Sequence, residues 1–237
     1  MRQSAAAIIA AHDRNGVLNR LISDRGRVLF GILALSLHFD GGGGLTPSRM
    51  AELCEQGGIC SRGRVKALLL LLRWAGHLVP AVEGSDQRRR PLAPTEQMMS
   101  AYRVRWRGQL ELIGSMVPEG SAGARCLDRP DVFAAFALAL GSAIRGGFRV
   151  LDHGGQALRS VADRDNGLLV LLRIALSGSA DGPMPPTAPV TVTVADLAAG
   201  ARVSRSHVLN VLRDAERAGL ITRDTARGPT AVIACRP

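Results

Sequence analysis

Two segments of the chain, CSRGRVKALLLLLRWAGHLV at residues 60–79 and VSRSHVLNVLRDAERAGLI at residues 203–221, follow one pattern. Each contains Ser-Arg, continues with apolar residues at the spacing of a buried helix face, and reaches Ala-Gly before a short strand-like stretch. A unit that recurs at one separation predicts two copies of one supersecondary module in the chain. Matched positions lie 143 residues apart: Ser61 with Ser204, Arg62 with Arg205, Val65 with Val208, Leu69 with Leu212, Gly76 with Gly219, and Leu78 with Ile221.

The second copy predicts two helices followed by a β-hairpin. Thr193 and Ser204 are suitable N-caps, and Gly200 is expected to end the first helix. Ala218-Gly219 is expected to end the second helix, and a turn is expected at Arg227-Gly228-Pro229. This is the element order of a winged helix-turn-helix. The expected strands are residues 220–222 and 231–234, and the expected core face of the second helix is Val208, Val211, Leu212 and Ala215.

The first copy predicts the same order of elements. Its leading helix is expected to start at Thr46-Pro47, because proline is favoured in a first helical turn. The turn at residues 55–58 is longer than its counterpart in the second copy, and an apolar helix is expected before each copy, at residues 28–37 and 168–176. The expected fold is mainly α with small β-hairpin wings, as tandem winged helix-turn-helix modules joined by a helical core.

Two long amphipathic helices are expected between the copies, the second opening at Pro130-Asp131. Their apolar stripes are interpreted as core packing, with a cofactor site as the less favoured interpretation. The expected organisation is an N-terminal helical arm at 1–25, a first module at 26–95, a connecting, dimerisation-like helical region at 96–160 and a second module at 161–237. The stripe of the first long helix is Met99, Tyr102, Trp106, Leu110, Ile113 and Val117.

The chain is strongly basic, with a formal net charge of +10. Such a charge favours an acidic macromolecular partner such as nucleic acid. Biased codon usage is the competing explanation, because Lys66 is the only lysine among 30 basic residues. No apolar run is long enough to span a bilayer, so the expected location is the cytoplasm, in association with the nucleoid, and no membrane partner is expected.

Neither an enzyme nor a metal protein is expected. The five histidines stand apart without metal-ligand spacing, and no nucleophile-elbow, zinc-protease or phosphate-loop motif is present. No catalytic residue, metal ligand or cofactor is therefore assigned. The four cysteines are interpreted as reduced, partly buried thiols, with a redox-sensing pair at Cys54 and Cys60 as the alternative.

The segment SDQRRRPLAPTEQ, residues 85–97, contains Asp86-x-Arg88, then Leu92, then Pro94-Thr95 ahead of a long helix. This order resembles the wing signature of the MarR family of transcriptional regulators. The resemblance covers roughly residues 28–117, and the glycine usual in that family three residues after the threonine is Met98 here. It implies winged helices presented to adjacent DNA grooves, and two modules in one chain then resemble a fused pseudo-dimer.

The second helix of each module is the element expected to bind DNA, because the N-terminal side chains of such a helix enter the major groove. Arginine matches two acceptors of guanine, so basic and polar residues off the core face are the expected contacts. Arg213 and the wing arginines are expected near the phosphate backbone or the minor groove, and a solvated charged face is the competing interpretation. The candidates are Arg205, Ser206, His207, Asn210 and Arg213 in the second module, Arg62, Arg64 and Lys66 in the first, and Arg88, Arg89, Arg90, Arg223 and Arg227 in the wings.

The second helix of the first module differs from its counterpart, because Leu70 and Leu71 lie off its core face. Leucine offers bases little specificity, so these residues are expected to face a neighbouring helix, a second subunit or another protein. A homodimer or a protein partner therefore stays open as an alternative role for the first module.

The function expected from the sequence is a sequence-specific regulator that binds double-stranded DNA at promoters or operators. Two alternatives share its architecture. A plasmid-type replication initiator would bind repeated origin sites, and a chromosome-organising scaffold would use tandem winged helices for protein contacts. No small-molecule effector is assigned from the sequence.

Overall fold

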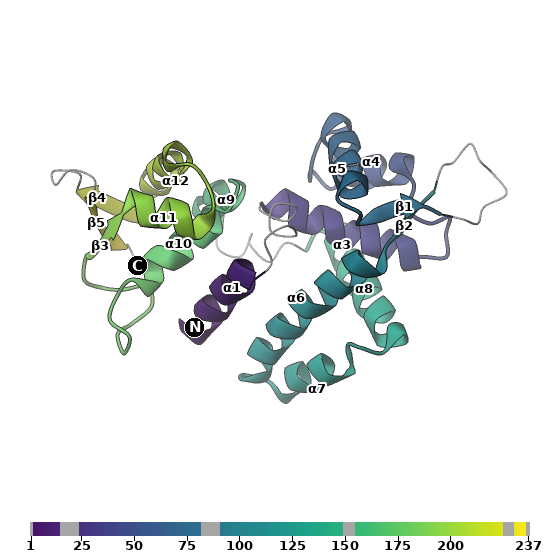
Figure 1. Ribbon diagram of the computed structural model, residues 1–237, viewed down its shortest axis with the longest axis horizontal. Helices are drawn as coiled ribbons and strands as arrows, with labels where there is room; N and C mark the ends of the chain where they lie inside the picture. Colours follow the sequence, from purple (N-terminus) through teal and green to yellow (C-terminus); the bar gives the residue numbers. More distant parts are fainter. Residues whose placement is uncertain (1, 15–23, 82–90, 149–154, 225–229, 236–237) are drawn as a thin grey trace. The chain divides into compact units, whose positions relative to one another are not determined.

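The computed structural model describes residues 2–14, 24–81, 91–148, 155–224 and 230–235 (Figure 1). It is mainly helical, with two small antiparallel sheets of two and three strands. The chain divides into two compact units. The central unit comprises Arg20–Ile22 and Gly26–Phe148, and the terminal unit comprises Met1–Asn19, Ser23–Arg25 and Arg149–Pro237.

In the described residues of the central unit, three helices are followed by a two-stranded hairpin and three further helices. Strand β1 pairs antiparallel with β2, with Leu78 opposite Pro94, and Leu45 adds a single bridge to Leu92. The elements are α3 (Arg25–Phe39), α4 (Pro47–Gln56), α5 (Arg62–Trp74), β1 (Leu78–Pro80), β2 (Leu92–Pro94), α6 (Glu96–Gly114), α7 (Pro118–Cys126) and α8 (Pro130–Arg145).

The expected helix start at Thr46-Pro47 is confirmed, and three side chains cap helices of this unit. Thr46 accepts a hydrogen bond from the amide of Arg49, and Ser61 accepts one from the amide of Arg64. Thr95 caps α6 by accepting from the amide of Met98, and its hydroxyl also donates to the carbonyl of Gly76 at 2.8 Å. Thr95 thus joins the start of α6 to the end of α5.

Aromatic side chains from α6 and α8 form the core beneath α3. The Trp106 ring lies 5.4 Å from Tyr102, 5.1 Å from Phe133 and 5.2 Å from Phe136, measured between centroids. The Arg103 guanidinium lies 4.8 Å from the centroid of the Phe133 ring, in cation–π geometry. The interpretation of the helical stripes as core is confirmed for these residues.

Close helix packing depends on small residues at two crossings. A Cβ atom on Gly31 of α3 would overlap the hydroxyl of Tyr102 on α6, and one on Gly141 of α8 would overlap Ser36 of α3. Glycine at these positions lets α3 approach both neighbouring helices.

The C-terminal end of the first stripe differs from the expectation. Helix α6 ends at Gly114, and α7 follows after a short turn. Ile113 and Val117 are exposed at this turn, although they were expected in the core. The apolar spacing continues past the point where α3 and α8 cover α6, so periodicity alone placed these two residues incorrectly.

The terminal unit contains a three-stranded sheet with the order β3-β5-β4 and both pairings antiparallel. Strand β3 was not predicted, and neither were α7 and α9. Helix α11 continues through Gly200 to Ala201, so the expected helix end at Gly200 is wrong. The elements are α1 (Arg2–Arg14), α9 (Gly155–Ala162), α10 (Gly167–Leu176), β3 (Val190–Thr193), α11 (Val194–Ala201), α12 (Arg205–Arg217), β4 (Ile221–Asp224) and β5 (Thr230–Cys235).

Helix α1, from the start of the chain, packs on α10 within this unit. Asp13 pairs with Arg173 at 2.8 Å, and its backbone carbonyl accepts a hydrogen bond from Arg202 at 2.8 Å. Arg173 in turn lies over Gly200, where a Cβ atom would contact its guanidinium. The missing side chain at Gly200 therefore makes room for an arginine that joins α1, α10 and α11.

The two sequence copies adopt matching local structures. Helices α5 and α12 both have 13 residues and begin after a capping serine, Ser61 or Ser204. Gly76 and Gly219 both follow the helix end with φ near 74° and 73°, in the left-handed region that favours glycine. The longer turn expected between the first pair of helices is also present, because α4 ends at Gln56 whereas α11 ends at Ala201.

The boundaries of the two units differ from the expected segments. Residues 96–148 belong to the central unit together with 26–95, whereas α1 and α9 belong to the terminal unit. Most of the region that was expected to connect two modules therefore belongs to the central unit.

The packing at Gly31 gives a testable prediction. Gly31→Ala should lower the free energy of unfolding by about 1–3 kcal/mol, because the added methyl group displaces buried Tyr102. Gly108→Ala, at an exposed site of α6 with no atom near the new Cβ, should instead raise it by about 0.5–1 kcal/mol. Both tryptophans of the chain lie in the central unit, so tryptophan fluorescence during denaturation reports on this unit. Equal effects of the two changes would contradict the close crossing.

Candidate nucleic-acid interface

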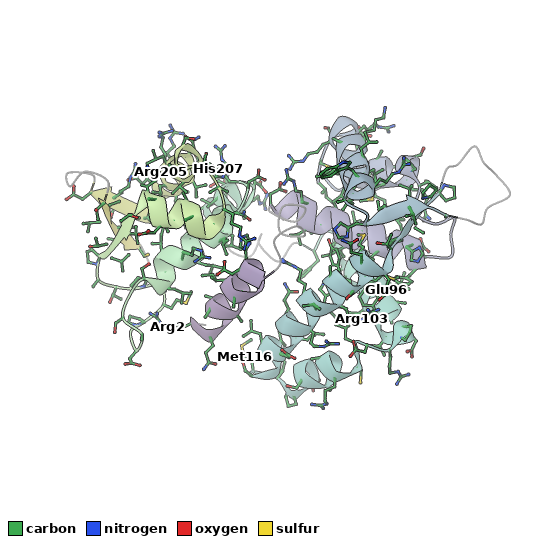
Figure 2. All side chains as sticks on the ribbon, in the orientation of Figure 1. Arg2, Glu96, Arg103, Met116, Arg205 and His207 are labelled. Atoms are coloured by element: carbon green, nitrogen blue, oxygen red, sulfur yellow. The ribbon has the colours of Figure 1, made fainter. Side chains whose placement is uncertain are left out.

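The N-terminus of α12 is exposed and carries no acidic residue in its first turn. Ser204 accepts a hydrogen bond from the amide of His207 at 3.1 Å, and its hydroxyl lies 2.9 Å from that of Ser206. Arg205 lies at this turn with an exposed side chain (Figure 2). Ser206 is exposed as well. Free amides and the helix dipole make such a terminus attractive to anions.

His207 has a structural contact that the sequence did not indicate. Its Nε2 atom donates to the backbone carbonyl of Asp165 at 2.8 Å, and its side chain is half-buried. In this arrangement His207 anchors α12 to the turn between α9 and α10. While this hydrogen bond is in place, the Nε2 atom is not available to a base.

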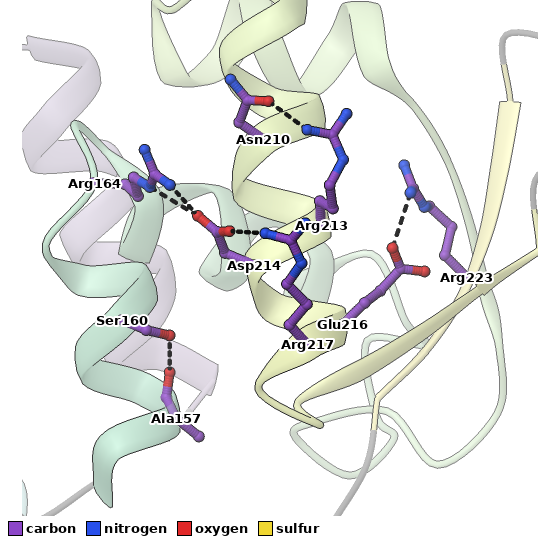
Figure 3. A network of polar contacts seen from close by, with 9 residues as sticks. All are labelled: Ala157, Ser160, Arg164, Asn210, Arg213, Asp214, Glu216, Arg217 and Arg223. Carbon is purple, nitrogen blue, oxygen red and sulfur yellow. Dashed lines mark hydrogen bonds and ion pairs between the residues drawn. The ribbon is translucent and has the colours of Figure 1, made fainter.

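The two acidic residues of α12 are each paired with an arginine from another part of the unit (Figure 3). Arg164, in the turn before α10, donates from Nε to Asp214 at 2.8 Å. Arg223 of β4 donates to Glu216 at 2.8 Å. The charge of each carboxylate is thereby neutralised by an arginine of the same unit.

The outward surface of α12 is mainly polar and cationic, with Leu209 as its one exposed large apolar side chain. Asn210 accepts a hydrogen bond from Arg213 at 2.8 Å, and Arg217 lies 3.6 Å from Asp214 while its side chain stays largely exposed. Arg205, Asn210, Arg213 and Arg217 share this exposed surface with Ser206.

The wing candidates divide into two groups. Arg223 was expected to contact DNA, and its side chain is only 14% exposed because it pairs with Glu216. Arg223 therefore neutralises the Glu216 carboxylate of α12 from within the unit. Arg88, Arg89, Arg90 and Arg227 lie outside the described residues.

The matching helix of the central unit, α5, has a different surface. Arg62, Arg64 and Lys66 are exposed near its N-terminus, and Arg62 pairs with Glu55 of α4 at 2.8 Å. Towards the C-terminus, Leu70 and Trp74 are exposed, whereas Leu71 is half-buried. The predicted separation of Leu70 from the core face is confirmed, and Trp74 was missed.

A short turn between α9 and α10 holds α12 in place, and sequence reasoning did not find it. Arg164 pairs with Asp214, Asp165 accepts from His207, and Asn166 donates to the carbonyl of Ala201 at 2.9 Å. Asn166 has φ 53°, a left-handed conformation that asparagine tolerates. The sequence Asp-Asn-Gly was a turn signal, but nothing in it indicated the partners of the turn.

A pocket of about 230 Å³ lies in the central unit between α3, α4 and α8. Asp40 and Arg49 form an ion pair of 2.7 Å at its wall, and the arginine holds the pKa of Asp40 below its usual value. None of the candidate DNA-binding residues lines this pocket.

Thiol and metal chemistry have little support in the described part of the chain. Burial, with the neighbouring Cys60, raises the pKa of Cys54 to about 12, so its reactive thiolate is scarce at neutral pH. Cys54, Cys60, Cys126 and Cys235 are all reduced. Among the described residues, no group of three acidic, histidine or cysteine side chains is arranged to hold a metal ion.

Comparisons with protein-family models, with curated proteins and with solved structures return no match to this chain. Within the described ranges, every helix is too short or too polar to cross a membrane.

Buried histidine predicts acid sensitivity of the central unit. Burial lowers the pKa of His77 and of His38, so the unfolded chain takes up protons at a higher pH than the folded unit does. The stability gained by keeping these histidines neutral is complete above the pKa of histidine in the unfolded chain, about 6.5. As the pH falls below that value, the free energy of unfolding decreases by up to about 1.4 kcal/mol per pH unit for each histidine.

His77→Leu should reduce this slope, because it removes one of the two histidines whose pKa is lowered by burial. Leucine should replace His77 without loss of a hydrogen bond, because neither ring nitrogen of His77 has a hydrogen-bond partner among the described residues. Denaturant titrations monitored by tryptophan fluorescence between pH 7.5 and pH 5 measure the slope. An unchanged slope in the double variant His38→Leu, His77→Leu would show that other groups cause the acid sensitivity.

Proposed function

We propose that this chain is a sequence-specific regulator that binds double-stranded DNA through two winged helix-turn-helix modules. The observation that carries the proposal is the surface of α12, where both acidic residues are paired within the unit and the exposed side chains, apart from Leu209, are cationic or polar. Arginines gathered on one helix face, without competing carboxylates, match the requirements of a DNA-binding helix.

In this proposal, α12 enters the major groove with its N-terminal end leading. Arg205 and Asn210 contact base edges, since arginine matches guanine and asparagine matches adenine through paired hydrogen bonds. Ser206 adds a shorter polar contact, and His207 keeps its bond to Asp165, so that it positions the helix. Arg213 and Arg217 contact phosphates on either side, which fixes the register without specifying sequence.

The central unit contributes backbone contacts from the start of α5. Arg62, Arg64 and Lys66 are exposed there and suit phosphates more than bases. The capping serines and matching glycines of α5 and α12 support two copies of one module, and the wing segment before α6 resembles that of MarR-family regulators. A pseudo-dimer in one chain follows from these two features.

The two alternatives differ from a regulator in their targets. A replication initiator would bind several repeats at one origin, whereas a regulator would bind scattered promoter sites. A chromosome-organising scaffold would keep its activity when the arginines of α12 are removed.

Arginine substitutions test the division between base and phosphate contacts. Arg205→Ala should lower discrimination between preferred and altered sites by about 1–3 kcal/mol, because one base contact is lost. Arg213→Ala should weaken binding to all sequences alike and reduce the slope of log affinity against log salt by about 1. Affinities are measured on duplexes that the wild-type protein enriches from a random library.

Arg129→Ala is the matched control, because it removes an exposed arginine of the central unit that pairs only with Asp131 in the described contacts. It should leave both affinity and salt dependence close to wild type. Identical behaviour of the three variants would mean that overall charge alone drives binding.

Footprinting tests the pseudo-dimer. One chain should protect two unequal half-sites about one helical turn apart, because its two modules differ in sequence. Protection of a single half-site at saturation would contradict the use of both modules on DNA.

A further inference from the structure

The central unit exposes two apolar patches that neither the core nor the proposed DNA contacts explain. The first, named the α5 patch, consists of Leu70 and Trp74. The second, named the α6–α7 corner, consists of Ile113, Met116 and Val117. Exposed large apolar side chains that cluster in this way mark interaction surfaces more often than isolated ones do.

The α5 patch lies on the last turns of its helix. Leu70 is 62% exposed and Trp74 is 88% exposed, and their i, i+4 spacing places them side by side on one face. Tryptophan is the side chain most enriched among residues that dominate binding energy at protein interfaces. The surroundings are basic, because exposed Lys66 and Arg73 lie on the same helix and α5 contains no acidic residue.

The α6–α7 corner has the same apolar character with the opposite charge. Met116 is 73% exposed, Val117 is 45% exposed and Ile113 is 41% exposed. Figure 2 shows Met116 at the end of α6. Glu119, in the first turn of α7, is exposed close to Val117 and gives this corner a negative charge.

We propose that the α5 patch of one copy of this chain docks on the α6–α7 corner of a second copy. The apolar residues of the two patches cover one another, while Arg73 approaches Glu119. Pairing of like patches is disfavoured, because two α5 patches bring positive charges together and two corners bring negative charges together. Complementary charge thus selects the contact between unlike patches.

This contact is head-to-tail. Figure 1 shows α5 and the α6–α7 turn at opposite ends of the central unit, so one chain cannot satisfy both patches by itself. A contact between different surfaces leaves one patch of each kind open in a dimer, and further copies add until a ring closes or a filament grows. Few side chains take part, so the dissociation constant should lie roughly between 10 and 100 µM.

The inference stands apart from the proposed function, because self-association does not need DNA. On DNA with neighbouring sites, the same contact would raise the effective concentration of each copy next to another and make binding cooperative.

Sedimentation velocity of the DNA-free protein from about 1 to 200 µM is the test, over a range that brackets the expected constant. The mean mass of the wild-type chain should rise without a plateau at the dimer, and tryptophan emission should shift to the blue as Trp74 is covered. Trp106 is already buried and serves as a constant background.

Trp74→Glu and Met116→Lys should each remain monomeric, because each places a repelling charge in one patch. Val104→Lys, at an exposed α6 position outside the corner, is the control and should associate like wild type.

Mixing the two variants gives the sharper result. Trp74→Glu keeps a working corner and Met116→Lys keeps a working α5 patch, so an equimolar mixture should form dimers and nothing larger. Circular dichroism and binding to one isolated DNA site should be unchanged in both variants, which separates a failure of this inference from a failure of DNA binding.

Three outcomes would overturn the inference. A wild-type chain that stays monomeric at the highest concentration excludes the contact. Loss of association in Trp74→Glu but not in Met116→Lys, with no dimer in the mixture, assigns the α5 patch to another surface. Quenching of Trp74 by a single-stranded oligothymidylate, without any self-association, assigns the α5 patch to base stacking.

Discussion

The arrangement of the terminal unit depends on the pairing of two carboxylates with two arginines. Asp214 and Glu216 lie on the same helix as the candidate DNA contacts, and either one left unpaired would repel a phosphate backbone. Arg164 and Arg223 reach them from a turn and from a strand, so the two acids also fasten α12 to its surroundings. These partly buried pairs determine which charges remain on the outer face of the helix.

Two helices with the same length and the same cap carry different surfaces. Val65, Leu68, Leu69 and Leu72 of α5 and Val208, Val211, Leu212 and Ala215 of α12 are buried in the same manner. Their outward residues have diverged, with Leu70 and Trp74 on α5 and with Asn210 and Arg213 on α12. Core positions are constrained by packing, whereas the outward positions are constrained only by what the surface binds. The two helices therefore share a buried face and differ in the surface that they present to solvent.

Local features of the fold could be predicted from the sequence, because caps and apolar spacing act within a few residues. Thr193 and Ser204 cap helices as expected, and the helix expected at Thr46-Pro47 begins there. Features that depend on distant partners could not be predicted. Gly200 was expected to end a helix, but it lies inside α11. Its missing side chain makes room for Arg173, which lies 27 residues earlier in the sequence and could not be recognised as its neighbour. The bond from His207 to Asp165 and the exposure of Ile113 likewise depend on which elements meet in space.

The composition of the terminal unit from both ends of the sequence has a consequence for how the protein is made. Helix α1 is synthesised well before α10, because Arg173, which pairs with Asp13, lies 160 residues further along the chain. The central unit can complete its contacts while α10 is still being synthesised, and until then α1 lacks the helix on which it packs. Because Asp13 also holds Arg202, in the turn before α12, the arrangement of α1, α10 and α12 is completed only after residue 202 has been synthesised. A nascent chain would thus present a folded central unit before α12 is held in place.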